Sequence, residues 1–129
     1  MIIPKEYKGH KVEVGDFLFE IEGTPASWWL DENCECEILV SRSLANAVER
    51  GEIPYYVFEY ILDHELRECE EAKKIAKEKG LSCSDLLRKA EEQGPFIEEA
   101  VRAHEIVSKD SKCVEILGRW VHDIVFKWR

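Results

Sequence analysis

The chain lacks several features that would place it in a specialised class of protein. No apolar run approaches the roughly 20 residues that a membrane-spanning helix needs. Residues 1–6 lack the charged and then apolar layout of a secretory signal. No internal repeat or low-complexity linker interrupts the 129 residues. We therefore expect one soluble, cytoplasmic domain that spans residues 1–129 and makes no contact with a membrane.

Basic residues are scarce relative to acids. The chain has 18 Lys and Arg against 27 Asp and Glu, which gives a formal net charge of −9. A nucleic-acid-binding surface needs clustered Lys and Arg, whereas the basic residues here are interspersed with acids. The sequence also has no glycine-rich phosphate loop and no serine or cysteine nucleophile in a recognisable setting. These absences argue against direct binding to nucleic acid and against the common nucleotide-binding and nucleophilic enzymes.

The five cysteines are odd in number and have no paired spacing. Cys34 and Cys36 are separated by one residue, but no second Cys or His pair stands nearby at the spacing of a zinc finger. A cytosolic chain keeps its thiols reduced. We therefore expect the cysteines to act mainly as small core residues.

Hydrophobic periodicity divides the chain into a sheet-forming first third and a helical remainder. Apolar residues alternate over 12–21 with Gly15-Asp16 between the two runs, which predicts a hairpin, and residues 28–30 and 36–41 predict further strands. Capping and glycine signals predict helices over residues 43–50, 54–80, 82–93, 95–108 and 111–128. The fold class is therefore α+β, with a small N-terminal antiparallel sheet followed by a helical bundle.

The helix that follows Pro54 carries three ionisable residues on the side that should face the core. At about 100° per residue, Glu65 falls near the middle of the apolar arc, and His64 and Glu68 fall along one edge of it. Burying an unpaired carboxylate costs several kcal/mol unless it is protonated, hydrogen-bonded or bound to a cation. A local hydrogen bond would explain one such residue, but three within five positions favour a polar site that binds a cation.

Residues 36–41 and 53–68 resemble the edge strand and active-site helix of zincin metallopeptidases, above all the small gluzincin-type and SprT-like members. Their helix carries His-Glu-x-x-His after a Pro-led apolar turn, and this chain has His64-Glu65-Leu66-Arg67-Glu68 after Pro54. Glu68 thus stands where the family has its second His. In that family two His one turn apart bind zinc, the Glu after the first His is the general base, and a third ligand comes from a later helix.

The resemblance implies a role for each matching residue. His64 is the first zinc ligand, and Glu65 is the general base that takes a proton from water. Glu68 can replace the second His because positions four apart share a helix face and a carboxylate is an acceptable zinc ligand. The strand with Ile38 and Val40 is the edge strand, which pairs with an extended peptide or protein substrate.

The helix predicted over 95–108 supplies the candidates for a third ligand. His104 lies inside its apolar arc, which is formed by Ile97, Ala100, Val101 and Val107. Glu98 and Glu105 border this arc, whereas Glu99 points away from it. The alternative for His104 is an ordinary core histidine that is bonded to a carbonyl or to Glu65.

These candidates define two types of metal site. His64, Glu68 and His104 would form a two-His, one-carboxylate zinc site. If Glu98 or Glu105 took the place of His104, the resulting one-His, two-carboxylate site would suit iron or manganese as well as zinc.

Three hypotheses for function follow. The first is a zincin-like, metal-dependent peptidase with Glu65 as general base. The second is a zincin-like binding or regulatory module without activity, and the third is a helical His and carboxylate metal-binding protein unrelated to peptidases. A carboxylate in place of a neutral imidazole lowers the Lewis acidity of a metal, so Glu68 favours the second hypothesis over the first for activity.

Overall fold

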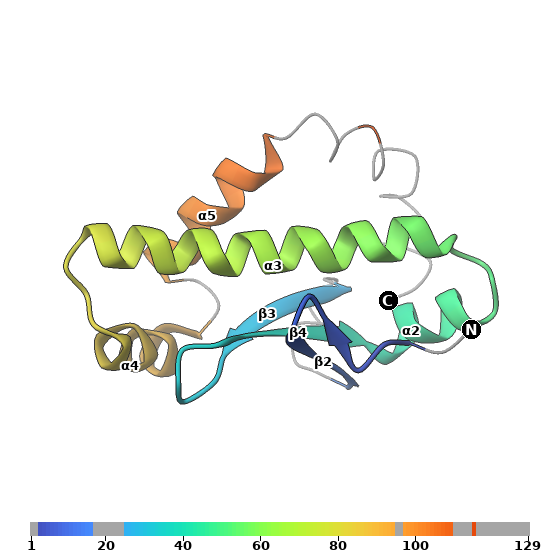
Figure 1. Ribbon diagram of the computed structural model, residues 1–129, viewed down its shortest axis with the longest axis horizontal. Helices are drawn as coiled ribbons and strands as arrows, with labels where there is room; N and C mark the ends of the chain where they lie inside the picture. Colours follow the sequence, from blue (N-terminus) through green and yellow to red (C-terminus); the bar gives the residue numbers. More distant parts are fainter. Residues whose placement is uncertain (1–2, 17–24, 95–96, 110–114, 116–129) are drawn as a thin grey trace.

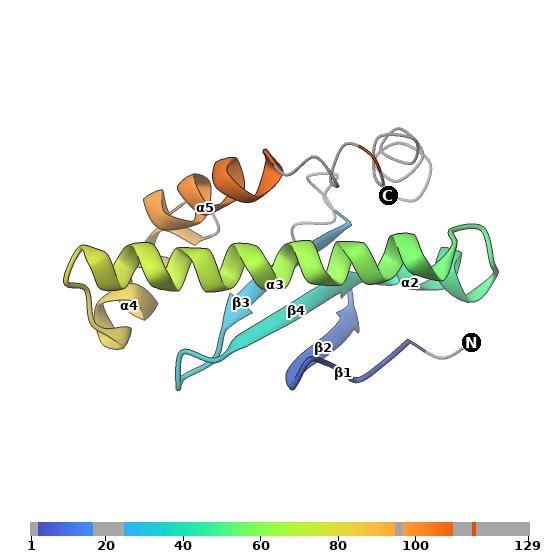
Figure 2. The same ribbon diagram turned by 45° about the horizontal axis from the view of Figure 1, so that its top comes forward.

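The computed structural model describes residues 3–16, 25–94, 97–109 and 115. Its strands are β1 (Glu6–Tyr7), β2 (His10–Gly15), β3 (Ala26–Leu30) and β4 (Cys36–Ser41). The helices of the described residues are α2 (Arg42–Glu49), α3 (Tyr55–Glu78), α4 (Cys83–Gln93) and α5 (Glu98–Ser108). This order confirms the α+β fold class. Helix α3 crosses one face of the sheet, and α4 and α5 lie on opposite sides of its C-terminal half (Figures 1 and 2).

The sheet is mixed, whereas the sequence predicted an antiparallel one. Its strand order is β1-β2-β4-β3, and β2 pairs with β4 in parallel while the other pairs are antiparallel. Strand β3 lies between β2 and β4 in the sequence. The chain therefore leaves β2, passes through β3 and then enters β4 in the same direction as β2. The second half of the predicted hairpin, residues 17–21, lies outside the described residues.

Strand β4 lies in the interior of the sheet, so the prediction that Ile38 and Val40 belong to an edge strand is wrong. Strand β2 pairs with one side of β4 and β3 with the other. Ile38 and Val40 are fully buried, because their side chains point from an interior strand into the core. Within the described residues, β3 is the edge strand on that side of the sheet.

Helix α3 follows its predicted limits and its predicted apolar face. It begins after Pro54, and Gly80 lies two residues beyond its end with φ of +75°, a conformation that glycine adopts without steric cost. The backbone N–H of Leu81 bonds to the carbonyl of Ala76 and closes the last turn at 2.9 Å. The buried face of α3 packs against β3 and β4 and contains Val57, Phe58, Ile61, Leu62, Leu66, Cys69, Ala72 and Ala76.

Four cysteines form disulfides, which corrects the prediction of reduced thiols. Cys36 of β4 is bonded to Cys69 of α3, and Cys34 is bonded to Cys83 at the start of α4. Cys34, Cys36 and Cys69 do lie in the core as expected. The expectation of free thiols depended on an assumed reducing compartment, and disulfides persist in oxidising compartments and inside hyperthermophiles. The cysteines therefore give no support to a cytosolic location.

Helix α5 is rotated relative to its predicted apolar arc, of which Ile97, Ala100 and Val107 are buried as predicted. Glu99, which was expected to point away from the core, is fully buried, whereas Val101 is 46% exposed. Glu99 Oε1 accepts a hydrogen bond from Lys89 of α4 at 2.6 Å and lies 3.6 Å from the ammonium of Lys79. Burial alone would raise the pKa of Glu99, but the hydrogen bond and charge of Lys89 lower it below its usual value. Two lysines from other elements thus allow a carboxylate on the inner face of α5.

The remaining predicted helix, residues 111–128, falls almost entirely outside the described residues. None of the helices that the structure describes combines the length and apolar character needed to cross a bilayer. The side chain of His10 is 20% exposed, and its Nδ1 atom lies 3.1 Å from the carbonyl oxygen of Cys36.

We predict that Lys89→Ala lowers the free energy of unfolding by about 1–3 kcal/mol, because it removes a charged hydrogen bond from the buried Glu99. The remaining Lys79 limits the loss. Urea denaturation measures the change. The matched control is Arg88→Ala on the same helix, whose exposed ion pair with Asp85 is worth about 0–1 kcal/mol. Equal stability of the two variants would contradict the role given to Lys89.

Candidate metal centre

Helix α3 supplies two of the three residues of the candidate site. His64 and Glu68 are one turn apart on the same face of the helix and are only 7% and 5% exposed. Both lie at the edge of the apolar face that packs on the sheet, as the sequence predicted. His64 Nε2 is 2.7 Å from Glu68 Oε1.

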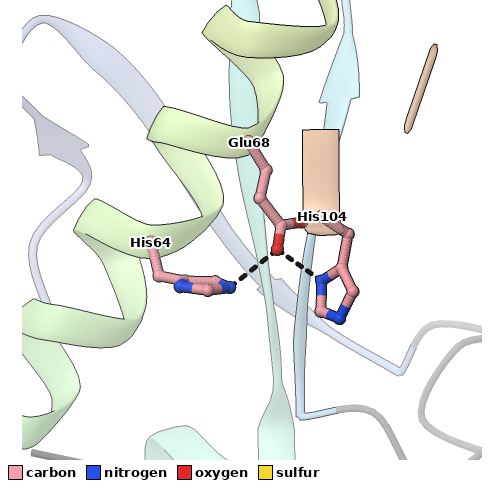
Figure 3. A group of neighbouring side chains, drawn as sticks. All are labelled: His64, Glu68 and His104. Carbon is pink, nitrogen blue, oxygen red and sulfur yellow. Dashed lines mark hydrogen bonds and ion pairs between the residues drawn. The ribbon is translucent and has the colours of Figure 1, made fainter. Parts of the chain in front are cut away.

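Helix α5 brings His104 to the same carboxylate. The Nδ1 atom of His104 is 2.6 Å from Glu68 Oε1, the same oxygen that contacts His64 (Figure 3). The side chain of His104 is 64% exposed, so this residue forms the solvent side of the group. One ligand atom from each of the three residues lies within 4.8 Å of the others, and the group could hold a metal ion.

Both imidazoles already form hydrogen bonds with the carboxylate of Glu68. Each is close enough to share a proton with the carboxylate oxygen, with Nε2 of His64 and Nδ1 of His104 as donors. The other nitrogen of His64, Nδ1, is buried and has no hydrogen-bond partner in the described part of the structure. Unsatisfied buried polar atoms are rare in native proteins and often mark functional positions.

The donor set matches the requirements of zinc. Two imidazole nitrogens and one carboxylate oxygen are the ligands of one well-known type of catalytic zinc site. With bonds of about 2.0–2.2 Å, a tetrahedral zinc ion keeps its ligand atoms about 3.3 Å apart. The two hydrogen-bonded distances of 2.7 and 2.6 Å are shorter, and all three atoms lie within 4.8 Å of one another, so the side chains must rotate for an ion to replace the two shared protons.

Within the described residues the carboxyl group of Glu65 makes no hydrogen bond to this group, and its pKa is strongly perturbed. Although part of the residue is accessible to solvent, enough protein surrounds its carboxyl group that desolvation raises its pKa well above 4.5. The negative charge of Glu68 raises this pKa further. Raised carboxyl pKa values are typical of groups that exchange protons during catalysis.

Aromatic and polar neighbours on α3 surround His64. Its ring lies 6.3 Å from that of Tyr60, and the hydroxyl of Tyr60 accepts a hydrogen bond from Arg67 at 3.1 Å. Arg67 Nε also lies 3.0 Å from a carboxylate oxygen of Asp63. This network fixes the helix face beside His64 without using either of its ring nitrogens.

The alternative third ligands lie away from the group. The side chain of Glu98 is 76% exposed and pairs with Lys79 at 3.2 Å. The side chain of Glu105 is 57% exposed and lies 3.8 Å from Arg102. Both side chains point to solvent because α5 is rotated relative to the predicted arc, with Glu99 on its inner face.

The same rotation overturns the interpretation of His104 as a core histidine. His104 is exposed, and its partner is Glu68 rather than a carbonyl or Glu65. The sequence analysis missed Ser108, whose hydroxyl oxygen lies 3.4 Å from Nε2 of His104. The spacing of one helical turn between His104 and Ser108 was the available signal.

Comparisons with protein-family models, with curated proteins and with solved structures found no match to this chain. The argument for a function therefore comes from the chemistry of the site.

We predict that Glu65→Gln stabilises the metal-free protein above pH 6. Because the pKa of Glu65 is raised in the folded state, the folded chain retains a proton that the unfolded chain releases. Stability therefore falls as the pH rises through the interval between the ordinary and the raised pKa. Glutamine has no such proton to lose.

Thermal unfolding in a chelator between pH 4.5 and 8 measures this effect. The advantage of Glu65→Gln should grow with pH and be smallest at pH 4.5. A difference that stays constant with pH would show that the carboxyl group does not titrate in this way.

Proposed function

We propose that this protein is a zinc-dependent hydrolase of the zincin type, which binds the metal through His64, Glu68 and His104 and cleaves peptide bonds. The observation that carries the proposal is the meeting of three ligand atoms from two helices within 4.8 Å. Their chemistry is that of a two-His, one-carboxylate zinc site. Iron is the alternative ion, because the same donor set also binds non-haem iron.

Glu65 supports a hydrolytic role for the site. A bound zinc ion would polarise a carbonyl group and lower the pKa of a water molecule. Glu65 would accept the proton of that water and then deliver it to the leaving amine. Its desolvated carboxyl group is suited to both steps, because a raised pKa makes the carboxylate a stronger base.

The edge of the sheet offers a place for an extended substrate. Strand β3 takes the role that the sequence analysis gave to β4, since its pairing partner among the described residues is β4 alone. Strand β3 also lies near α5, because residues 27–30 line a pocket together with Ile97 and Ala100. An extended peptide would add to β3 through main-chain hydrogen bonds.

A second candidate function is a metal-binding or regulatory module without catalysis. It is favoured by the hydrogen bonds that Glu68 already accepts from both histidines. Because these hydrogen bonds connect Glu68 of α3 to His104 of α5, they also hold α5 against α3. Activity measurements separate this candidate from a hydrolase.

We predict that the protein binds one zinc ion per chain and that His64→Ala or His104→Ala weakens binding by at least about 100-fold. Removal of a residue that coordinates the ion should lower metal affinity at least as much as removal of a residue that only supports a ligand, which typically lowers it about 10–100-fold. Metal content after dialysis against zinc or ferrous iron, measured by mass spectrometry, tests both the site and the ion.

The matched control for metal binding is Glu105→Gln. Glu105 lies one residue from His104 and was a candidate ligand, but it points to solvent. This variant should bind zinc like the wild type. Equal zinc in the wild type and His64→Ala would show that the ion, if present, is elsewhere.

We predict that Glu65→Gln retains zinc but loses at least 100-fold in the rate of peptide cleavage, because general-base catalysis contributes about 10²–10⁴-fold. Cleavage of an unfolded casein and of a defined peptide mixture, followed by mass spectrometry, measures the rate. A zinc-loaded wild type that cleaves neither substrate would contradict the hydrolase and favour the binding module.

A further inference from the structure

The Cys34–Cys83 disulfide lies at the opposite end of the sheet layer from α2, outside the candidate metal centre. Cys34 is in the turn between β3 and β4, and Cys83 is the first residue of α4. Both views show this turn beside α4 (Figures 1 and 2). Cys83 is exposed, whereas Cys34 is 9% exposed, so a reagent in solution can reach the Cys83 sulfur.

The turn holds Cys34 in an unfavourable backbone conformation. Its φ is +59°, a region that costs a residue with a Cβ roughly 1–2 kcal/mol. Hydrogen bonds from the backbone N–H groups of Asn33 and Glu35 to Asp31 Oδ1, at 2.8 and 2.9 Å, keep the turn in this shape. Backbone strain of this kind is often found where a protein carries out chemistry.

A cavity of about 540 Å³ adjoins the disulfide and carries a positive charge. Cys34 and Cys83 line it together with Lys73, Lys74 and Lys77 of α3. None of these three lysines forms an ion pair within the part of the chain that the structure describes.

Acids also lie near the cavity, among them Glu71, which lines two other pockets together with Lys74. Glu70 lines the cavity and has its Oε1 atom 3.9 Å from Nε2 of His10. Asp85 accepts a hydrogen bond from the backbone N–H of Ser82 and pairs with Arg88 at 3.0 Å. The three lysines therefore outnumber the one lining carboxylate.

We propose that the Cys34–Cys83 disulfide is a thiol–disulfide exchange site for small anionic thiols, of which glutathione is the common cellular example. Unpaired lysines raise the local concentration of an anionic reagent. The N-terminus of α4 stabilises the Cys83 thiolate, which leaves in the second step of the exchange, and a more stable leaving thiolate departs faster.

The exchange proceeds in two balanced steps. The thiolate of the reagent attacks Sγ of Cys83, a sulfur–sulfur bond forms between them, and the Cys34–Cys83 bond breaks. Cys34 Sγ leaves with the electron pair and takes a proton from solvent. A second thiolate then attacks the reagent sulfur of the mixed disulfide and releases Cys83 as a thiolate. The two thiols end as one reagent disulfide, and their two electrons reduce the protein.

The second disulfide provides an internal reference. Cys36 and Cys69 are 1% and 0% exposed, so no thiol reaches either sulfur in the folded protein. Selective exchange should therefore convert Cys34 and Cys83 to thiols while Cys36–Cys69 remains intact.

The test measures exchange at each disulfide in the folded protein by timed alkylation and peptide mass spectrometry. The probes are 3-mercaptopropionate, which is anionic, 2-mercaptoethanol, which is neutral, and cysteamine, which is cationic. Rates are divided by the thiolate concentration of each reagent. At low salt the anionic thiol should reduce Cys34–Cys83 about tenfold faster than the neutral one and faster still than the cationic one. In 0.5 M salt this preference should largely disappear.

A pair of variants with the same change in net charge separates the local lysines from the overall charge. Lys73→Gln with Lys77→Gln should abolish the preference for the anionic thiol. Lys5→Gln with Lys11→Gln should keep it, because Lys5 directly precedes β1, Lys11 lies on β2 and neither lines the cavity.

Three results would overturn the proposal. They are reduction of both disulfides at one common rate, no preference for the anionic thiol at low salt, and free thiols at Cys34 and Cys83 in the protein purified without reductant. The measurements do not depend on a bound metal, so they are independent of the proposed hydrolase.

Discussion

The placement of α3 across the sheet is the constraint on which the rest of the described structure depends. Its buried face packs against β3 and β4, and the Cys36–Cys69 disulfide joins it covalently to the interior strand β4. This bond restricts rotation of the helix about its own axis. Glu68 directly precedes Cys69, so its carboxylate is fixed at the edge of the buried face, where α5 can reach it. The candidate site is therefore a consequence of how one helix is anchored.

A carboxylate in that place is an energetic problem that the neighbouring residues reduce. Glu68 is 5% exposed, and an isolated charge so far from water would cost several kcal/mol. Two imidazoles reach one of its oxygens and share protons with it. A divalent cation would replace those protons with a stronger charge interaction. The same three side chains can thus stabilise the packing of α5 without metal and bind a metal when it is present.

The parts of this arrangement that depend on local sequence could be predicted, and those that depend on distant contacts could not. The helical spacing of apolar residues in α3, with Pro54 before the helix and Gly80 after it, predicted where the helix begins and ends. It also predicted that His64 and Glu68 lie on the side that faces the core. The orientation of α5 could not be obtained in this way, because the charge partners of the buried Glu99 are Lys79, just after α3, and Lys89 of α4. Strand order and disulfide pairing are likewise properties of chain segments that are far apart in sequence.

Helix α5 has a consequence for how the site becomes accessible. Its buried side chains include Ala100 and Ala103, which contribute little apolar area, and its polar attachments are Glu99 and His104, about 7.5 Å apart along the axis. Segments with little apolar burial open locally at a lower free energy than the whole domain. Because His104 joins α5 to Glu68, any local opening of this helix would uncover the carboxylate while α3, held by its disulfide to β4, keeps its place.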